Sequence, residues 1–193
     1  MARIILGLPD RKLANLDAYT TESVAVETIP GIYYHDASGK VIEIRLDQGE
    51  VQLKYLEKWT KLTPVGGNLY KLGRRNITFA FGEQTVLNQE GAIQKLRKLS
   101  AEPEAQMAQT CGGTYYSKEV DGSFTVTWED GALWLDHYGQ VRKQLHLLEG
   151  ETYAYGSMGN KKHIEFLRDE TGAVTGFIHK TVQTQRMPFQ KVK

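Results

Sequence analysis

The chain has 193 residues, of which 40% are hydrophobic and 24% are charged, and its formal net charge is +1. A charge this close to neutral gives no electrostatic reason to expect a nucleic acid or an anionic membrane surface as a partner. No apolar run approaches the roughly 20 residues that cross a bilayer as a helix, and residues 1–7 are too short for a secretory signal. We therefore expect a soluble protein. The sequence does not indicate its cellular compartment, since any export signal would lie outside this sequence. The single cysteine, Cys111, excludes an intrachain disulfide.

Residues 1–22 are expected to form an N-terminal arm. The apolar residues that follow Ile4 are interrupted by Gly7 and Pro9. Glycine and proline break regular structure, so this pattern predicts a short helical piece that ends near Leu6 and then an irregular or weakly helical stretch.

Residues 23–99 are expected to form a first β domain. Residues 23–28 alternate and carry β-branched side chains, which predicts an opening strand. The apolar period is two from Val41 to Leu46, and it resumes after a turn at 47–50 in which Gly49 can adopt a positive φ. Further glycine-containing turns punctuate the domain at 37–39, 66–68, 73–76 and 88–91.

Residues 100–110 are the only later stretch without a β pattern. They are expected to be an interdomain linker, with one helical turn after Pro103. Residues 111–193 show a second β domain, in which glycine-containing turns separate strands of about six residues.

The two β domains repeat one another. Gly31-Ile32-Tyr33-Tyr34 returns 82 positions later as Gly113-Thr114-Tyr115-Tyr116. An alternating apolar run that begins at Ile42 returns at the same offset from Phe124. Self-similarity at a fixed offset over this much of the chain indicates a duplicated structural unit.

The length of each repeat matches one small closed barrel. Eight strands of about 5–6 residues joined by turns of two to five residues account for about eighty residues. Closure also removes the exposed edges that an open sheet would have to protect. The predicted fold class is therefore all-β, with two tandem eight-stranded antiparallel barrels. The barrels are expected to dock on each other, because a unit of about 80 residues buries only roughly 60–65% of its unfolded surface, which is marginal for independent stability. A β-sandwich with the same turn spacing is the alternative.

The sequence contains no recognisable catalytic or metal-binding motif. The five histidines are not spaced as a ligand pair and no cysteine or carboxylate cluster accompanies them, so no metal or cofactor is predicted, although a zinc site assembled from distant strands stays open. No serine is followed three positions later by lysine, and Gly-x-Ser-x-Gly and Lys-Thr-Gly are absent. A catalytic triad assembled from residues on separate strands remains an alternative. Cys111 is interpreted as a small buried hydrophobe.

Aromatic residues supply the candidate contact sites. Five residues on two successive strands of the second domain share an inward face: Phe124, Val126, Trp128, Leu133 and Leu135. Trp134 then points outward, and Trp59 lies in a stretch that is predicted to be irregular. Exposed aromatic side chains are preferred contact residues, so both are candidates for an interface or a ligand patch. His137 and Tyr138 occupy an expected hairpin tip, where a solvated histidine is the simplest interpretation.

The second repeat resembles the C-terminal lipocalin-like barrel of serine hydrolases of the β-lactamase and penicillin-recognising superfamily. The first repeat resembles a degenerate copy, and two tandem barrels are the arrangement of D-aminopeptidase-like members. Residues 2–7 also resemble the end of the last helix of such a catalytic domain. The segments that carry the resemblance in the second repeat are 113–119, 128–135 and 164–177.

The resemblance implies an accessory function. The family's Ser-x-x-Lys, Tyr-x-Asn/Ser and Lys-Thr-Gly elements are absent, so no catalytic residue is carried over to this chain. It implies a non-catalytic barrel module that packs on a β-lactamase-like catalytic domain, in cis or in trans, and shapes substrate access. Trp134, His137 and Tyr138 are then the first candidates for the docking surface. A free-standing lipocalin-like protein that binds a small apolar ligand is the alternative, and an autonomous enzyme with an unfamiliar site is a third hypothesis.

Overall fold

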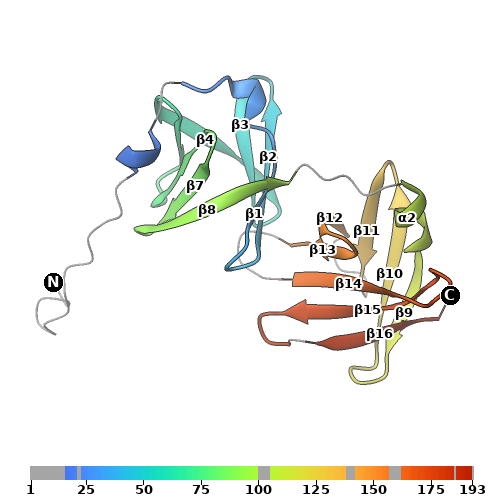
Figure 1. Cartoon of the computed structure of the whole chain (residues 1–193). Helices are drawn as coiled ribbons and strands as arrows, with labels where there is room; N and C mark the ends of the chain where they lie inside the picture. Colours follow the sequence, from blue (N-terminus) through green and yellow to red (C-terminus); the bar gives the residue numbers. More distant parts are fainter. Residues whose placement is uncertain are drawn as a thin grey trace, which may run out of the picture.

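The protein folds into two closed antiparallel β-barrels of eight strands each (Figure 1). The computed structural model describes residues 16–20, 23–99, 105–137, 142–156, 162–184 and 186–192. Closure confirms the predicted fold class and rules out the sandwich alternative. The helical piece predicted near Leu6 lies outside the described residues.

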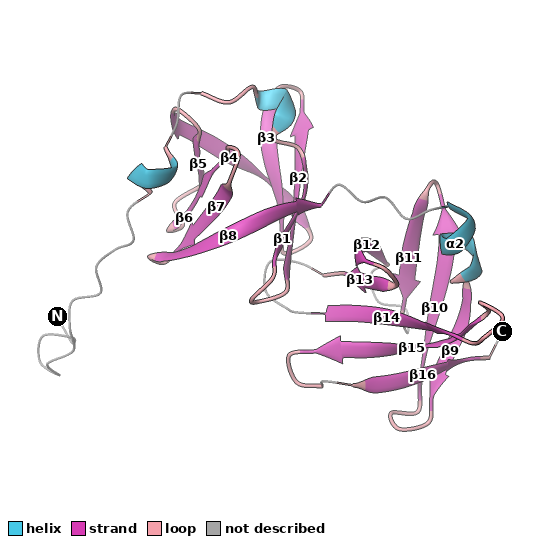
Figure 2. Ribbon diagram, viewed as in Figure 1, coloured by secondary structure: helices cyan, strands magenta, loops and turns pink. Residues whose placement is uncertain are grey.

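The strands of the first barrel follow one another in chain order, and the first strand pairs with the last (Figure 2). They are β1 (Gly31–His35), β2 (Lys40–Asp47), β3 (Glu50–Tyr55), β4 (Lys58–Gly66), β5 (Leu69–Leu72), β6 (Ile77–Ala80), β7 (Thr85–Gln89) and β8 (Ala92–Leu99). Two short 3-10 helices, η1 (Asp17–Tyr19) and η2 (Val26–Thr28), precede them.

The second barrel has the same up-and-down topology, with β16 returning to β9. Its strands are β9 (Gly113–Ser117), β10 (Gly122–Glu129), β11 (Ala132–Asp136), β12 (Lys143–Glu149), β13 (Thr152–Ala154), β14 (Lys162–Arg168), β15 (Val174–Thr181) and β16 (Met187–Lys191). The helix α2 (Ala105–Thr110) precedes β9, which confirms the helical turn expected after Pro103.

Two local predictions were wrong. Residues 23–28 form no strand: residues 23–25 are irregular and η2 follows, because β1 already pairs with β2 and β8 from Gly31 and Ile32 onward and leaves no edge for an earlier strand. Trp59 is not in an irregular stretch, since the two-residue turn after Tyr55 lets Lys58 resume pairing at once in β4.

The sequence repeat is also a repeat of register. Gly31 lies opposite Ile44 between β1 and β2, and Gly113 lies opposite Val126 between β9 and β10. Gly113 and Val126 each follow their counterparts in the first barrel, Gly31 and Ile44, by 82 positions. The duplicated segments therefore fold with identical strand pairing.

The start of each barrel is fixed by an equivalent tyrosine. The buried Tyr33 hydroxyl donates a 2.6 Å hydrogen bond to the carbonyl oxygen of Ile29, and Tyr115 donates one of the same length to Cys111. These bonds satisfy backbone acceptors at the point where the short helix meets the first strand. Each preceding helical turn is thereby tied to the first strand of its barrel.

Each barrel has its own hydrophobic core. The five residues predicted to face inward in the second barrel do so: Phe124, Val126, Leu133 and Leu135 are buried in that core, and Trp128 packs against it. The period-two pattern therefore identified the core-facing side of these strands correctly.

Candidate functional site

Trp59 projects from β4 and is 37% exposed. The guanidinium of Arg45 lies 4.4 Å from the centroid of its ring. That guanidinium is itself held by Asp47 at 2.9 Å. A cation over the ring is attracted to the aromatic face and covers part of it. Trp59 is therefore half-covered and is not part of a bare apolar patch.

Trp134 lies on β11 and points away from the core, as expected from its position between Leu133 and Leu135. The guanidinium of Arg142 lies 4.9 Å from its ring centroid. The indole nitrogen donates a 3.3 Å hydrogen bond to the carbonyl oxygen of Glu129. The outward tryptophan is thus partly covered by its own barrel.

His137 is not the solvated histidine that was expected at a hairpin tip. Its ring stacks on Phe124 at a centroid distance of 4.4 Å, and it is only partly exposed. Burial, followed by the charge of Lys162, lowers the pKa of His137. Tyr138 lies outside the described residues. The prediction of a solvated His137 was wrong because Phe124, the first inward-facing side chain of β10, leaves one face of its ring uncovered, and the imidazole of His137 packs on that face.

His137 lines a cavity of about 290 Å³ in the second barrel. His179 faces the same cavity, and its Nε2 lies 2.7 Å from the hydroxyl of Tyr155. Burial is the main cause that lowers the pKa of His179 to about 4, with Lys162 and His137 contributing. His179 is therefore neutral at pH 7, and it acts as a hydrogen-bonding partner rather than as a cation.

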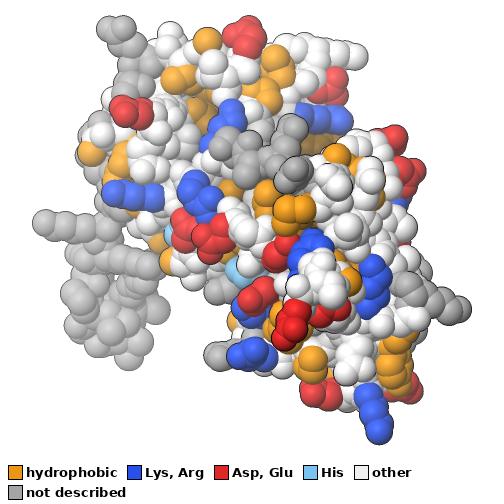
Figure 3. All heavy atoms as spheres, turned by 45° about the vertical axis from the view of Figure 1, so that its right-hand side comes forward, with side chains coloured by type: hydrophobic (Ala, Val, Ile, Leu, Met, Phe, Trp, Pro, Cys, Tyr) orange, Lys and Arg blue, Asp and Glu red, His pale blue; other side chains and the backbone are white. Residues whose placement is uncertain are grey.

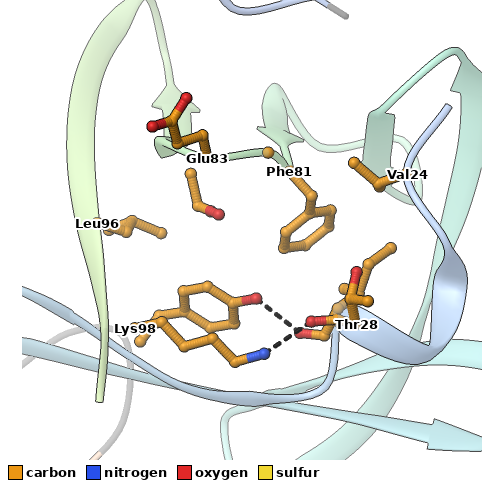
Figure 4. Close-up of a pocket in the computed structure, with 10 residues that line it drawn as sticks. Val24, Thr28, Phe81, Glu83, Leu96 and Lys98 are labelled. Atoms are coloured by element: carbon orange, nitrogen blue, oxygen red, sulfur yellow. Dashed lines mark hydrogen bonds between the residues drawn. The ribbon is translucent and has the colours of Figure 1, made fainter. Parts of the chain in front are cut away.

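A second cavity, of about 380 Å³, opens in the first barrel (Figure 4). Its walls are mainly apolar, and they include Phe81 and Leu96. Lys98 lies at its margin, where the ammonium donates a 2.7 Å hydrogen bond to the carbonyl oxygen of Thr28. Concave apolar sites with a few polar groups are the usual form of small-molecule sites. The sequence signalled neither cavity.

The two barrels pack against each other through the β1–β2 hairpin of the first and strands β12 to β14 of the second (Figure 1). Tyr34, Val41 and Ala154 form a small buried apolar cluster between them. The hydroxyl of Tyr34 lies 2.6 Å from Nε2 of His163 on β14. The interface therefore combines apolar contact with a buried hydrogen bond.

A group of charged side chains lies beside this cluster. Glu43, whose side chain is 13% exposed, is 2.9 Å from the ammonium of Lys54 and 3.7 Å from Nε2 of His146 in the other barrel. Although burial alone would raise it, the nearby His146 and the hydrogen-bonded ammonium of Lys54 leave the pKa of Glu43 below its usual value. A second pair, Lys143 with Glu57, joins the barrels at 2.6 Å.

These interface residues were not predicted, but the sequence held one signal for them. Strands that bury one face alternate, whereas β1 and β2 each contain two consecutive buried residues. The extra residues, Tyr34 and Val41, face away from their own core and contact the second barrel. Doubling also occurs in β7, where Val86 and Leu87 are both buried, so it indicates a second buried face and not this interface alone.

Among the described residues, no group of three or more histidine, cysteine or acidic side chains is arranged to hold a metal ion. Cys111 is fully buried, and burial raises the pKa of its thiol to about 11, so it is a thiol at neutral pH. Trp59 lies on β4 of the first barrel and Trp134 on β11 of the second. The pair Glu57–Lys143 joins the turn before Trp59 to strand β12, which pairs with β11.

No protein-family model and no curated protein matches this chain. In the described ranges, no helix has the length and apolar character required to cross a bilayer. Acidic and basic side chains are interspersed over the face shown in Figure 3.

Proposed function

We propose that this chain is a non-catalytic accessory module that packs on a β-lactamase-like serine hydrolase domain, in cis or in trans, and shapes access of substrates to it. The observation that carries the proposal is the tandem arrangement of two equivalent barrels joined by a buried interface. Two closed barrels held together in this way provide a rigid support for surface loops.

The chemistry of the described residues fits a supporting function. Cys111 is buried and protonated, and the hydroxyl of Ser117 is buried without a hydrogen-bond partner. Nucleophilic catalysis needs an accessible nucleophile with a base beside it. Neither side chain is in such a position, so the proposal assigns the reaction to another domain.

The proposed docking surface includes Trp134 and His137. Tyr138, the third candidate from the sequence, lies outside the described residues. Trp134 is partly exposed and lies under Arg142, which also pairs with Glu129 at 2.6 Å. Tryptophan and arginine are the residue types that most often dominate the energy of a protein–protein contact. Trp59 with Arg45 forms a similar pair on the first barrel.

The test begins with the gene. The reading frame around the codon for Met1, and the neighbouring genes, should encode a catalytic domain with Ser-x-x-Lys. That domain is then assayed on a small and a bulky substrate, with and without this chain, and the ratio of the two kcat/KM values should change when the chain is present. The variant Trp134→Ala should reduce this change, while Val120→Ser, at an exposed residue of the same barrel, should not.

Two outcomes contradict the proposal. One is an unchanged kcat/KM ratio in the presence of the chain. The other is hydrolysis of a D-amino-acid amide or a β-lactam by this chain alone, abolished by a reagent that modifies active-site serines.

A further inference from the structure

The two barrels differ at the end that the preceding helical turn covers. In each barrel a lysine lies over the repeated tyrosine: Lys98 is 5.6 Å from the ring centroid of Tyr33, and Lys191 is 5.8 Å from that of Tyr115. Each ammonium also donates to the carbonyl oxygen of an equivalent threonine, at 2.7 Å and 2.9 Å. The two ends are therefore equivalent at the tyrosine, the lysine and the threonine.

Large aromatic side chains fill this end of the second barrel. Phe189 lies two residues before Lys191 and pairs with Phe177 across the strands, and the two rings stack at 4.9 Å. In the first barrel the equivalent ladder pair is Leu96 with Thr85. The smaller pair leaves space that the two phenylalanines occupy in the second copy.

Arg168 also seals the second barrel. Its guanidinium pairs with Glu151 at 2.8 Å and donates to Thr110 Oγ1 at 2.9 Å and to the carbonyl oxygen of Met107 at 3.4 Å. The equivalent residue of the first barrel is Glu83, which is exposed. An acidic side chain cannot donate these hydrogen bonds to the carbonyl groups of the short helix.

The consequence is the cavity of about 380 Å³ in the first barrel. The second barrel shows that the same fold closes with this end filled, so barrel closure does not require the cavity. Side chains around an apolar cavity lack contacts that a ligand of matching shape would restore.

The lining defines the chemistry of that ligand. Figure 4 shows Val24, Phe81 and Leu96 around the space, with Lys98 and Thr28 on the side opposite Glu83. The Glu83 carboxylate is turned away from Phe81 in this view. In the described part of the chain, no carboxylate pairs with the ammonium of Lys98.

We propose that this cavity of the first barrel binds a small apolar carboxylate, with its hydrocarbon part against Phe81 and Leu96 and its carboxylate at Lys98. The carboxylate would accept a charge-assisted hydrogen bond from an ammonium whose position is already set by Thr28 and Tyr33. The ligand site goes beyond the accessory function and does not depend on it.

The test is calorimetric titration of the full chain with octanoate and with octanol, which has the same chain length and no charge. Both should bind the unmodified protein. Thr85→Phe places a phenyl ring in the first barrel at the position that Phe177 occupies in the second, and it should reduce the affinity for both ligands by at least about tenfold. Lys98→Met should reduce the affinity for octanoate by about fivefold and leave the affinity for octanol unchanged.

The matched control is Lys191→Met, which removes the equivalent lysine from the filled barrel and should change neither affinity. If Thr85→Phe fails to fold, Leu96→Phe fills the same space from the facing strand. Absence of binding to the unmodified protein, or unchanged binding by the filled variant, overturns the proposal. Tighter binding of octylamine than of octanoate, lost in Glu83→Gln, overturns the assignment of an anion. None of these results depends on a hydrolase assay, so failure here is distinct from failure of the accessory function.

Discussion

The hydroxyl of Tyr34 in the first barrel lies 2.6 Å from Nε2 of His163 in the second. Both side chains are buried, with Tyr34 4% and His163 8% exposed. Burial raises the pKa of Tyr34, so it remains a neutral hydrogen-bonding group at physiological pH. A buried hydrogen bond between residues 129 positions apart fixes the relative placement of two barrels that share one linker.

The first prediction concerns this bond. Tyr34→Phe and His163→Leu should each destabilise the chain, and their effects should be non-additive by about 1 kcal/mol, because either change removes the same hydrogen bond. Urea unfolding of both single variants and of the double variant measures the coupling. Additivity within about 0.3 kcal/mol would show that the contact adds nothing to docking.

The second prediction concerns Glu43. Its pKa is lowered in the folded protein, so its contribution to stability is fully present above the unfolded value of about 4.3 and is lost as the pH falls through the folded value. Glu43→Gln should therefore destabilise the chain at pH 7 by roughly 1–3 kcal/mol, because Lys54 and His146 lose a buried partner. Unfolding curves of the variant and of the unmodified chain should converge under acidic conditions.

Glu50 supplies the control for Glu43. It pairs with Lys61 in the same sheet, but its side chain is 45% exposed. Exposed ion pairs contribute little, so Glu50→Gln should change stability by less than about 1 kcal/mol at any pH. Equal effects of the two substitutions would contradict the importance of the interface pair.

The third prediction concerns His179. Burial lowers its pKa to about 4, so the unfolded chain binds a proton more readily than the folded chain between that value and about 6.5. The stability that neutral His179 contributes is complete above about pH 6.5 and falls by roughly 3 kcal/mol as the pH is lowered to 4. Thermal unfolding at several pH values in this range measures the slope of stability against pH.

His179→Phe should reduce that slope, because phenylalanine does not titrate and can keep the edge contacts that His179 makes with Phe124 and Phe189. His35→Asn, at a residue bonded to Ser38 in the first barrel, should leave most of the slope in place. If stability depends on pH as steeply in His179→Phe as in the unmodified chain, the pH dependence comes from another titratable group.

The fourth prediction concerns the turn between β3 and β4. Leu56 and Glu57 both have positive φ, at 48° and 63°, and the turn contains no glycine. Left-handed backbone strains a leucine, whereas asparagine tolerates it. Leu56→Asn should therefore raise the free energy of unfolding by roughly 0.5–1 kcal/mol.

The control for this turn is Leu56→Ala. Leu56 is 68% exposed, so alanine removes its side chain at little packing cost and keeps the backbone strain. Calorimetric melting of both variants separates the two effects. Equal stability of the asparagine and alanine variants would show that backbone strain is not stored in this turn.

Much of the fold was predictable because barrel formation depends on local patterns. Phe124 and Val126 alternate with polar residues, and Gly49 follows Gln48 in a turn where both have positive φ. Periodicity of two selects the inward face, and glycine marks the reversals. The prediction failed at Trp59 because a turn of two non-glycine residues carries no such mark.

The candidate sites were less predictable because they depend on contacts between distant segments. The sequence predicts an exposed hairpin tip at His137, whereas in the folded chain its ring stacks on Phe124. The cavity of the first barrel depends on Thr85 facing Leu96 where Phe177 faces Phe189 in the second. This difference arises from the pairing of strands in space, which the offset between the repeats does not encode.

The sequence by itself determined that the chain is all-β and built twice, since alternation and turn glycines act over a few residues and repeat 82 positions later. Only the tertiary structure decided which outward side chains meet between the barrels and which barrel keeps an open cavity. Those outcomes depend on volume and charge brought together from strands far apart in the chain, and spacing along a sequence does not encode them.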